Sequence, residues 1–227
     1  MAWYDLEEIA DILDREKLKV IENKKDKVLK RDRKLYISFM ERQYVRISIL
    51  DDLIQLPRNN ELLRLVTQQN FNAFALFLFI LKKEKPIEVY LTTYSIDKQT
   101  VKGLGEILAN NPNLKLTFVM ASLLKHDKPK LRNELIDYAH KYKYCQFVEV
   151  YNHTKIIAVR TTKNSYVIEG SGNLSANARI ESYLFDNNKG SFIFHKNWID
   201  DIINEVKGTE VLKSKKCIII KNNNDGN

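Results

Sequence analysis

One segment in the second half of the sequence holds side chains that could bind and cleave a phosphate ester. His153 and Lys155 lie two positions apart in HTKIIAVR (153–160), a predicted β-strand, and side chains two apart in a strand point the same way. The next predicted strand, SYVIEG, leads into GSGN at 170–173. Its two glycines allow a tight turn and let backbone N–H groups approach a ligand, while Ser171 and Asn173 contribute a hydroxyl and an amide. An imidazole, an ammonium, an amide and backbone donors at one place predict a site for an oxyanion, most naturally a phosphoryl group.

The elements that would position this segment alternate between helix and strand. Their short connections predict an α/β domain with a mixed, largely parallel β-sheet flanked by helices. Three later strand-like runs are expected to pair locally before a final helix. The predicted strands are 87–94, 114–121, 145–151, 153–160, 165–170 and 180–187, and the predicted helices are 71–81, 96–109, 130–142 and 194–206.

The first 60 residues differ from the rest and are predicted to form a small N-terminal α+β appendage. A short helix at 6–12 would precede a poorly amphipathic helix, and LYISFM (35–40) and YVRISIL (44–50) are predicted strands. Residues 15–34 include ten Lys or Arg and four Asp or Glu. That basic stretch is either a solvated helix face or a surface that tracks phosphates.

Composition and charge limit the class of protein. A hydrophobic fraction of 44% excludes wholesale disorder, and the longest apolar run, AFALFLFIL, is far shorter than the roughly 20 residues of a membrane-spanning helix. The acidic, amphipathic start is unlike a signal peptide, and two cysteines give neither a disulfide framework nor a metal-binding spacing. We therefore expect a soluble, cytoplasmic protein without a membrane partner, whose net charge of +8 suits a polyanion.

The spacing of the chemical groups resembles that of a known family. The His-x-Lys pair, the 14 residues of 156–169 and then GSGN resemble the signature of the phospholipase D superfamily of phosphodiesterases. The similarity continues through GSGNLSANARIE and FHKNWIDDII and reaches back to VYLTTYSID, so it covers about 71–206. The pattern is similar to phospholipase-D-like proteins of phages and mobile elements and to the homodimeric bacterial endonucleases of the superfamily. It implies a phospholipase-D-like catalytic domain at 61–207, between the basic appendage at 1–60 and a C-terminal edge strand with a frayed tail at 208–227.

The resemblance also implies a mechanism. Members attack phosphorus with the motif histidine and release the phosphohistidine with water, so His153 would be the nucleophile or the acid that protonates the leaving oxygen. Lys155 and Asn173 would hold the non-bridging oxygens, Gly172 would help to bind the phosphate, and Ser171 would support the turn or contact the phosphate. This chemistry needs no metal and no cofactor. The implied activity is a metal-independent phosphodiesterase, most naturally a nuclease acting on nucleic acid, with DNA favoured.

A glutamate and a second histidine would complete the implied site. Glu181, from the following strand, would orient the His153 imidazole through its other nitrogen. The remaining histidines do not supply the second motif: the His-x-Lys at His126 runs into a proline in a surface loop entering a helix, His140 lies on a helix face, and His195 is expected near a helix end. Two-histidine chemistry would need two chains, so we expect a homodimer that shares its active site about a twofold axis.

Two departures from the family pattern keep other functions open. Arg160 stands where the motif has an aspartate, and the gap before GSGN is a few residues longer than the commonest spacing, which a longer turn at 162–164 could absorb. The main alternative is a phospholipase-D-like DNA-binding module with weak or no catalysis. The others are a phospholipid-directed phosphodiesterase and a plain α/β domain in which His153 is a satisfied core histidine.

Overall fold

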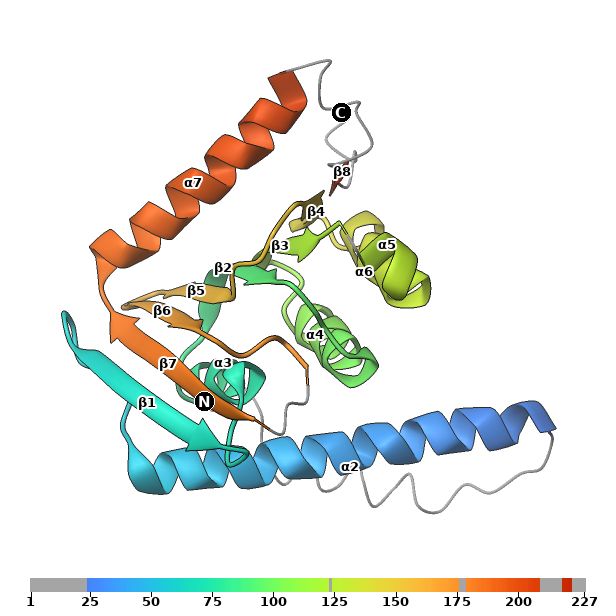
Figure 1. Cartoon of the computed structure of the whole chain (residues 1–227), viewed down its shortest axis with the longest axis horizontal. Coiled ribbons are helices and arrows are strands. Elements are labelled where there is room, and N and C mark those ends of the chain that lie inside the picture. The colour runs from blue at the N-terminus through green and yellow to red at the C-terminus, as the bar shows by residue number, and fades with distance from the viewer. Residues whose placement is uncertain (1–23, 123, 176–178, 209–217, 222–227) are drawn as a thin grey trace.

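The described part of the chain has a mixed α/β architecture built on one twisted sheet (Figure 1). The computed structural model describes residues 24–122, 124–175, 179–208 and 218–221. Within these ranges, eight strands are hydrogen-bonded in the order β1-β7-β6-β5-β2-β3-β4-β8. Their bounds are β1 (Leu62–Gln68), β2 (Pro86–Thr93), β3 (Lys115–Ala121), β4 (Cys145–Val150), β5 (Ile156–Thr161), β6 (Ser165–Gly170), β7 (Ile180–Asn187) and β8 (Ile218–Lys221).

The mixed α/β class is confirmed, but the expectation of a largely parallel sheet is wrong. Only β2, β3 and β4 pair in parallel, and every other pairing between neighbouring described strands is antiparallel. The reason is the length of the connections. Helical crossovers link β2 to β3 and β3 to β4, whereas the links from β4 through β7 contain no crossover helix among the described residues. Strand β1 was not predicted, because half of its side chains are exposed and its pattern is weak.

Helices cover both faces of the sheet (Figure 1). One hydrophobic core joins α2, α3, α4 and α6 to one face, and a second joins α7 to the other. Side-chain caps begin three of these helices: Asn72 Oδ1 accepts from Ala75 N at 2.8 Å before α3, Asp97 Oδ1 accepts from Thr100 N at 2.8 Å before α4, and Asn188 Oδ1 accepts from Ser191 N at 3.0 Å before α7. The helices are α2 (Lys24–Leu53), α3 (Ala73–Lys83), α4 (Lys98–Asn110), α5 (Leu124–Asp127), α6 (Pro129–Lys141) and α7 (Lys189–Gly208).

The described part of the predicted α+β appendage is helical up to Leu53, so the two strands predicted at 35–40 and 44–50 are wrong. Both segments belong to α2, whose buried residues recur at spacings of three and four along one stripe. Aromatic and β-branched residues favoured strands locally, but the longer helical period decides the structure because it lets this stripe pack on α3 and α4. The buried stripe consists of Tyr36, Phe39, Gln43, Ile47 and Leu50.

The ends of the chain complete the comparison with the sequence. The expected C-terminal edge strand is confirmed as β8, which pairs antiparallel with β4. The predicted helix at 6–12, residues 15–23 of the basic stretch and the tail at 222–227 lie outside the described residues, while residues 24–34 begin α2. The division of the chain at 60 and 207 stays a prediction. Of the helices in the described part, none is long and apolar enough to cross a membrane.

One edge of the sheet gathers the segments that carry the predicted chemistry. Because β2, β3 and β4 run parallel and β5 runs against β2, the ends of those three strands meet the start of β5. Antiparallel pairing brings the end of β6 and the start of β7 to the same edge. This row of strand ends, which is not an edge strand, is called the site edge below. A mixed α/β sheet usually binds its ligand there.

Candidate active site

His153 lies in an extended segment just before β5, because the strand begins at Ile156, three residues later than predicted. The polar side chains on either side of His153 hold this segment in place. Asn152 Nδ2 donates to the carbonyl oxygens of Thr93 at 3.2 Å and Val119 at 3.3 Å, and its Oδ1 accepts from Thr154 N at 2.9 Å. These side-chain bonds replace a regular strand ladder at the site edge.

His153 and Lys155 still lie together, as the alternation of an extended chain predicts. The Lys155 Nζ donates to the His153 carbonyl oxygen at 2.8 Å and lies 3.4 Å from Nδ1 of the imidazole. The His153 ring is exposed and contacts the Tyr94 ring, with 4.9 Å between centroids. His153 is therefore not a buried core histidine, which removes the support for the plainest alternative.

The GSGN segment leaves the end of β6 and crosses toward the end of β2. Asn173 Oδ1 accepts from Thr93 Oγ1 and from Ser95 N, both at 3.3 Å, and Thr93 Oγ1 in turn accepts from Leu174 N at 3.2 Å. The Asn173 Nδ2 makes no hydrogen bond within the described residues. Gly170 N donates to the Lys155 carbonyl oxygen at 3.2 Å, so the segment carrying Lys155 and GSGN are joined directly.

A tyrosine ring explains the two glycines better than a tight turn does. Neither Gly170 nor Gly172 has a positive φ, so no left-handed conformation requires glycine. A Cβ at Gly170 would lie 2.4 Å from Tyr183 Cδ1, and one at Gly172 would lie 2.2 Å from the Tyr183 hydroxyl. Glycine is needed because the buried Tyr183 ring packs against the backbone here.

Ser171 and Glu181 form a pair on the neighbouring ends of β6 and β7. The Ser171 hydroxyl donates to Glu181 Oε2, and Ser182 N donates to Ser171 Oγ at 3.1 Å. Ser171 thus connects the two strands, which agrees with a supporting role in the turn. The predicted hydrogen bond from His153 to Glu181 stays a prediction.

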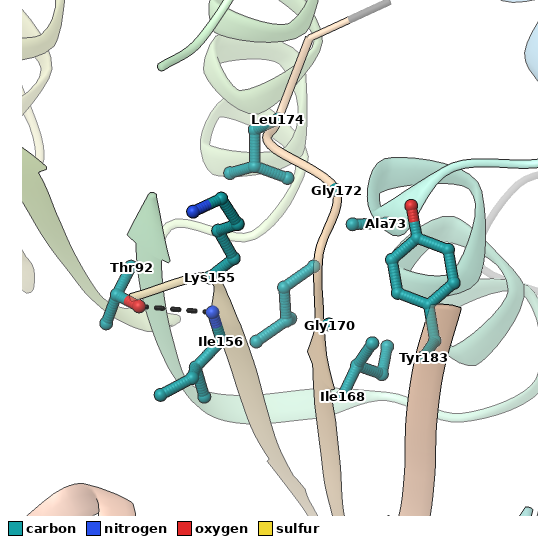
Figure 2. A pocket seen from close by; sticks show the side chains of 10 residues that line it. Ala73, Thr92, Lys155, Ile156, Ile168, Gly170, Gly172, Leu174 and Tyr183 are labelled. Atoms are coloured by element: carbon teal, nitrogen blue, oxygen red, sulfur yellow. Dashed lines mark hydrogen bonds between the residues drawn. The ribbon is translucent and has the colours of Figure 1, made fainter. Parts of the chain in front are cut away.

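A shallow pocket lies between these segments (Figure 2). About 200 Å³ of empty space, open solvent included, lies between its lining residues. Figure 2 shows Lys155 and Gly172 on its rim, with Tyr183 and Ala73 on the side of α3. Ile156 N donates to Thr92 Oγ1 at 3.1 Å at its base. Lys155 and the glycine backbone therefore line the same pocket.

Sequence reasoning missed the residues that hold the site from outside the motifs. Thr93 and Asn152 are buried polar residues at strand ends, and that position is the signal that could have indicated them. Arg46 of α2 gave no sequence signal. Burial and the like charge of Arg42 lower the pKa of Arg46, while electrostatic interactions with Tyr183 and Asp97 act in the opposite direction.

Arg160 lies at the other end of β5, away from the site edge. Its Nε donates to Glu88 Oε2 at 2.8 Å, and its guanidinium also lies 2.6 Å from that oxygen. Glu88 is buried on β2 opposite Arg160. The motif has an aspartate at this position. This chain has Arg160 there, and the carboxylate that pairs with it, Glu88, comes from the neighbouring strand β2. This position is part of the sheet packing and does not enter the site.

The other histidines lie elsewhere in the fold. His195 is inside α7 rather than at a helix end, because the helix begins at Lys189 and not near 194. It is buried, with Nε2 3.0 Å from Glu169 Oε1, and its Nδ1 accepts from Trp198 Nε1 at 3.1 Å. This hydrogen bond from His195 lowers the pKa of Glu169, with burial acting against it. His140 is exposed on α6.

The second His-x-Lys pair comes close to the site edge. His126 belongs to the short helix α5, which follows β3, and Lys128 follows it as the residue before α6. Lys128 Nζ donates to Ser95 Oγ at 3.0 Å and to the Ile96 carbonyl oxygen at 2.6 Å. Lys128 therefore anchors the loop that also binds Asn173. In the described residues, no three His, Cys, Asp or Glu side chains form a group that could hold a metal ion.

Comparisons with known proteins give structural likeness only. No family model and no curated protein matches this sequence. Among solved structures, the archaeal chromatin protein TrmBL2, whose structure is described as showing a novel mode of DNA binding, is 13% identical with a TM-score of 0.46, over 79% of this chain and 66% of that one. Polyphosphate kinase from Porphyromonas gingivalis is 10% identical with a TM-score of 0.48, over 62% of this chain and 26% of that one. Phosphatidylserine synthase from Haemophilus influenzae is 11% identical with a TM-score of 0.47, over 74% and 42%.

This chain spans two thirds or less of the length of each of those proteins. With identities this low and TM-scores below 0.5, the likenesses carry no argument about its activity. Membership of the phospholipase D superfamily therefore stays a proposal that rests on the motifs and on the geometry of the site edge.

Proposed function

We propose that this protein is a metal-independent phosphodiesterase of the phospholipase D superfamily that cleaves nucleic acid, with DNA as the first candidate. The observation that carries this proposal is the meeting of His153, Lys155 and Asn173 at one edge of the sheet. An exposed imidazole contacts an ammonium there, beside a pocket bordered by Gly172. Cleavage of a phosphodiester needs a nucleophile that attacks phosphorus, and a cation and neutral hydrogen-bond donors that hold the phosphate oxygens.

The contact between Lys155 and His153 bears on which role the imidazole can take. An ammonium has only N–H donors, so it can approach Nδ1 favourably only when Nδ1 is unprotonated. A neutral ring then carries its proton on Nε2, which leaves no lone pair on that nitrogen for attack on phosphorus. To attack through Nε2, the ring must carry its proton on Nδ1, and Lys155 must turn from the imidazole to the phosphate. An arriving phosphate, with its full negative charge, favours that movement.

The proposed reaction uses two histidines. One Nε2 forms a bond to phosphorus while the bond from phosphorus to the leaving oxygen breaks, and the other histidine gives that oxygen its proton. The second histidine then takes a proton from water, whose oxygen attacks phosphorus and breaks the P–N bond. Each ring returns to its starting state, and the net reaction is hydrolysis.

A homodimer would supply the second histidine. Support for it comes from one face of β1 and β7 that exposes apolar side chains, as interaction surfaces do. Ile180 on this face is next to Glu181, so a twofold contact here would bring two site edges near one another. The exposed fractions are 46% for Leu62, 73% for Val66, 67% for Ile180 and 37% for Leu184. Light scattering should give the mass of a dimer, and Val66→Asp should give a folded monomer without cleavage activity. A fully active monomer would exclude the shared site.

The nuclease assay is direct. Purified protein should cut plasmid or oligonucleotide DNA in the presence of EDTA, and His153→Ala should abolish cutting. His140→Ala is the matched control, because His140 is also exposed but lies on α6. When labelled nucleic acid is used and the reaction is stopped in alkali, the wild-type protein should carry the label covalently. Absence of that label from His153→Ala would identify the phosphohistidine. Intact DNA and RNA after incubation with the dimer would exclude the nuclease.

The alternative is a DNA-binding module without turnover. It is favoured by the hydrogen bond from Ser171 to Glu181, which engages the carboxylate that catalysis would assign to His153. Binding that weakens with salt, survives His153→Ala and leads to no cleavage would identify this alternative.

A further inference from the structure

Two exposed tyrosines flank His153 at the site edge. Tyr94 follows β2 directly, is 36% exposed, and contacts the His153 ring at 4.9 Å between centroids. Tyr151 follows β4 directly, two residues before His153, and is 75% exposed. An exposed fraction of 75% is high for a large ring with a substantial apolar surface, and both residues stand at the site edge that carries His153.

The spacing of the strands sets how far apart the two tyrosines leave the sheet. The ends of β2 and β4 are separated by β3, so the two tyrosines leave the sheet about 10 Å apart, two strand spacings. Asn152, between Tyr151 and His153, is tied to the carbonyl oxygens of Thr93 and Val119. The backbone that carries Tyr151 is thus pinned across the ends of β2 and β3. The rings belong to a fixed edge of the sheet and not to a free loop.

The surroundings of the rings are polar and cationic. Lys155 lies against His153, and Lys128 anchors the loop that follows Tyr94. Aromatic faces beside cations are the combination that binds single-stranded nucleic acid, because bases stack on the rings while the cations track the backbone. In a duplex the bases are already stacked on one another, so they cannot use such rings.

We propose that Tyr94 and Tyr151 form a nucleobase platform, and that the substrate is single-stranded nucleic acid whose bases stack on these rings while a phosphate enters the site at His153. This inference rests on the proposed function, since the phosphodiester at His153 determines which nucleotides reach the tyrosines. It adds the strandedness of the substrate and two residues that bind it.

The experiment compares polymers with and without bases. Fluorescence anisotropy would measure binding of His153→Ala protein, which does not cut its ligand, to a labelled oligothymidylate, to an abasic deoxyribose-phosphate chain of the same length, and to a duplex. The oligothymidylate should bind best. Tyr151→Ala in that background should weaken its binding about tenfold and leave the abasic chain unchanged, and Tyr151→Phe should restore it. Tyr94→Ala should act in the same direction.

Tyr144 is the matched control. It is 41% exposed and lies beside Lys143, but it precedes β4 and so stands at the opposite edge of the sheet. Tyr144→Ala should change none of these affinities. Equal binding of oligothymidylate and abasic chain, or equal losses for both in Tyr151→Ala, would overturn the platform. Tighter binding to vesicles of an anionic phospholipid, lost in Tyr151→Ala, would overturn it as well.

The proposal of a nucleobase platform and the proposal of a phosphodiesterase can be refuted independently. Base-dependent binding without any cleavage by the wild type would leave the platform and remove the phosphodiesterase. Cleavage of DNA without preference for bases would leave the phosphodiesterase and remove the platform.

Discussion

The packing of Tyr183 against GSGN can be tested by adding one methyl group. In Gly172→Ala the new Cβ would lie 2.2 Å from the Tyr183 hydroxyl, 3.0 Å from Cζ and 3.3 Å from Cε1. Ordinary contact needs about 3.5 Å, so the hydroxyl must move by more than an ångström. Tyr183 is only 2% exposed and has little room to move. Such overpacking costs about 1–3 kcal/mol, and the entropy that alanine removes from the unfolded chain returns about 0.4–1 kcal/mol. We therefore expect a net loss of about 1–2 kcal/mol.

Tyr183→Phe should relieve most of this loss, because it removes the nearest atom. The distances that remain, 3.0 and 3.3 Å, require shifts of only a few tenths of an ångström. By itself Tyr183→Phe should cost less than about 1 kcal/mol. The hydroxyl lies near the Ala73 N–H, but in a geometry too poor for a hydrogen bond. The double variant should lie within about 0.5 kcal/mol of Tyr183→Phe, which gives a coupling energy of about 1–2 kcal/mol.

Urea unfolding followed by circular dichroism measures these free energies. Gly170→Ala is the control, since its Cβ would meet the Ser182 carbonyl oxygen at 2.5 Å and Tyr183 Cδ1 at 2.4 Å, atoms that Tyr183→Phe does not remove. Tyr183→Phe should therefore not restore the stability that Gly170→Ala loses. If Gly172→Ala is as stable as the wild type, or if Tyr183→Phe rescues both alanine variants equally, the packing argument is refuted.

Three further predictions concern other parts of the fold. Arg160→Asp, which restores the motif's aspartate, should destabilise the protein by about 1–3 kcal/mol in urea unfolding, because the new carboxylate would face buried Glu88; a variant as stable as wild type would contradict the pairing. Phe39→Ala should cost about 3–5 kcal/mol if α2 is part of the core, and near-neutrality would contradict this. The hydrogen bond from His195 lowers the pKa of Glu169, so the stability that this bond contributes is present above the ordinary glutamate pKa of 4.5 and is lost as the pH falls through the lowered value. In unfolding experiments at a series of pH values, Glu169→Gln should therefore reduce the loss of stability at acid pH. An unchanged loss would contradict the assignment.

Much of the fold could be predicted from local sequence patterns. The run at 180–187 agrees with β7 residue for residue, and β2, β3 and β4 lie within one residue of their predicted bounds at each end. The hydrophobic pattern of each segment and its short connections were enough for this, because a strand's own residues indicate which of its side chains are buried. The parallel or antiparallel sense of the sheet is different, since it depends on which connections contain a crossover helix.

The helix at 24–53 shows where local patterns mislead. Its segments 35–40 and 44–50 contain aromatic and β-branched residues that favour strands, yet they form one helix because the buried stripe packs on α3 and α4. Propensity is a weak preference, and burial of a continuous stripe outweighs it. The role of the two glycines was likewise hidden, because Tyr183 reaches them from a strand more than ten residues later in the chain.

For the candidate site, the sequence alone indicated the side chains to which the proposed chemistry is assigned. His153 and Lys155 lie on one side of an extended chain because successive side chains alternate, and this holds even though the strand starts later than predicted. Only the tertiary structure decided what surrounds them. It placed Tyr94 against the imidazole, and it paired Ser171 with Glu181 and Arg160 with Glu88. Each of these contacts joins residues from different strands or helices, and no local spacing encodes which elements pack together.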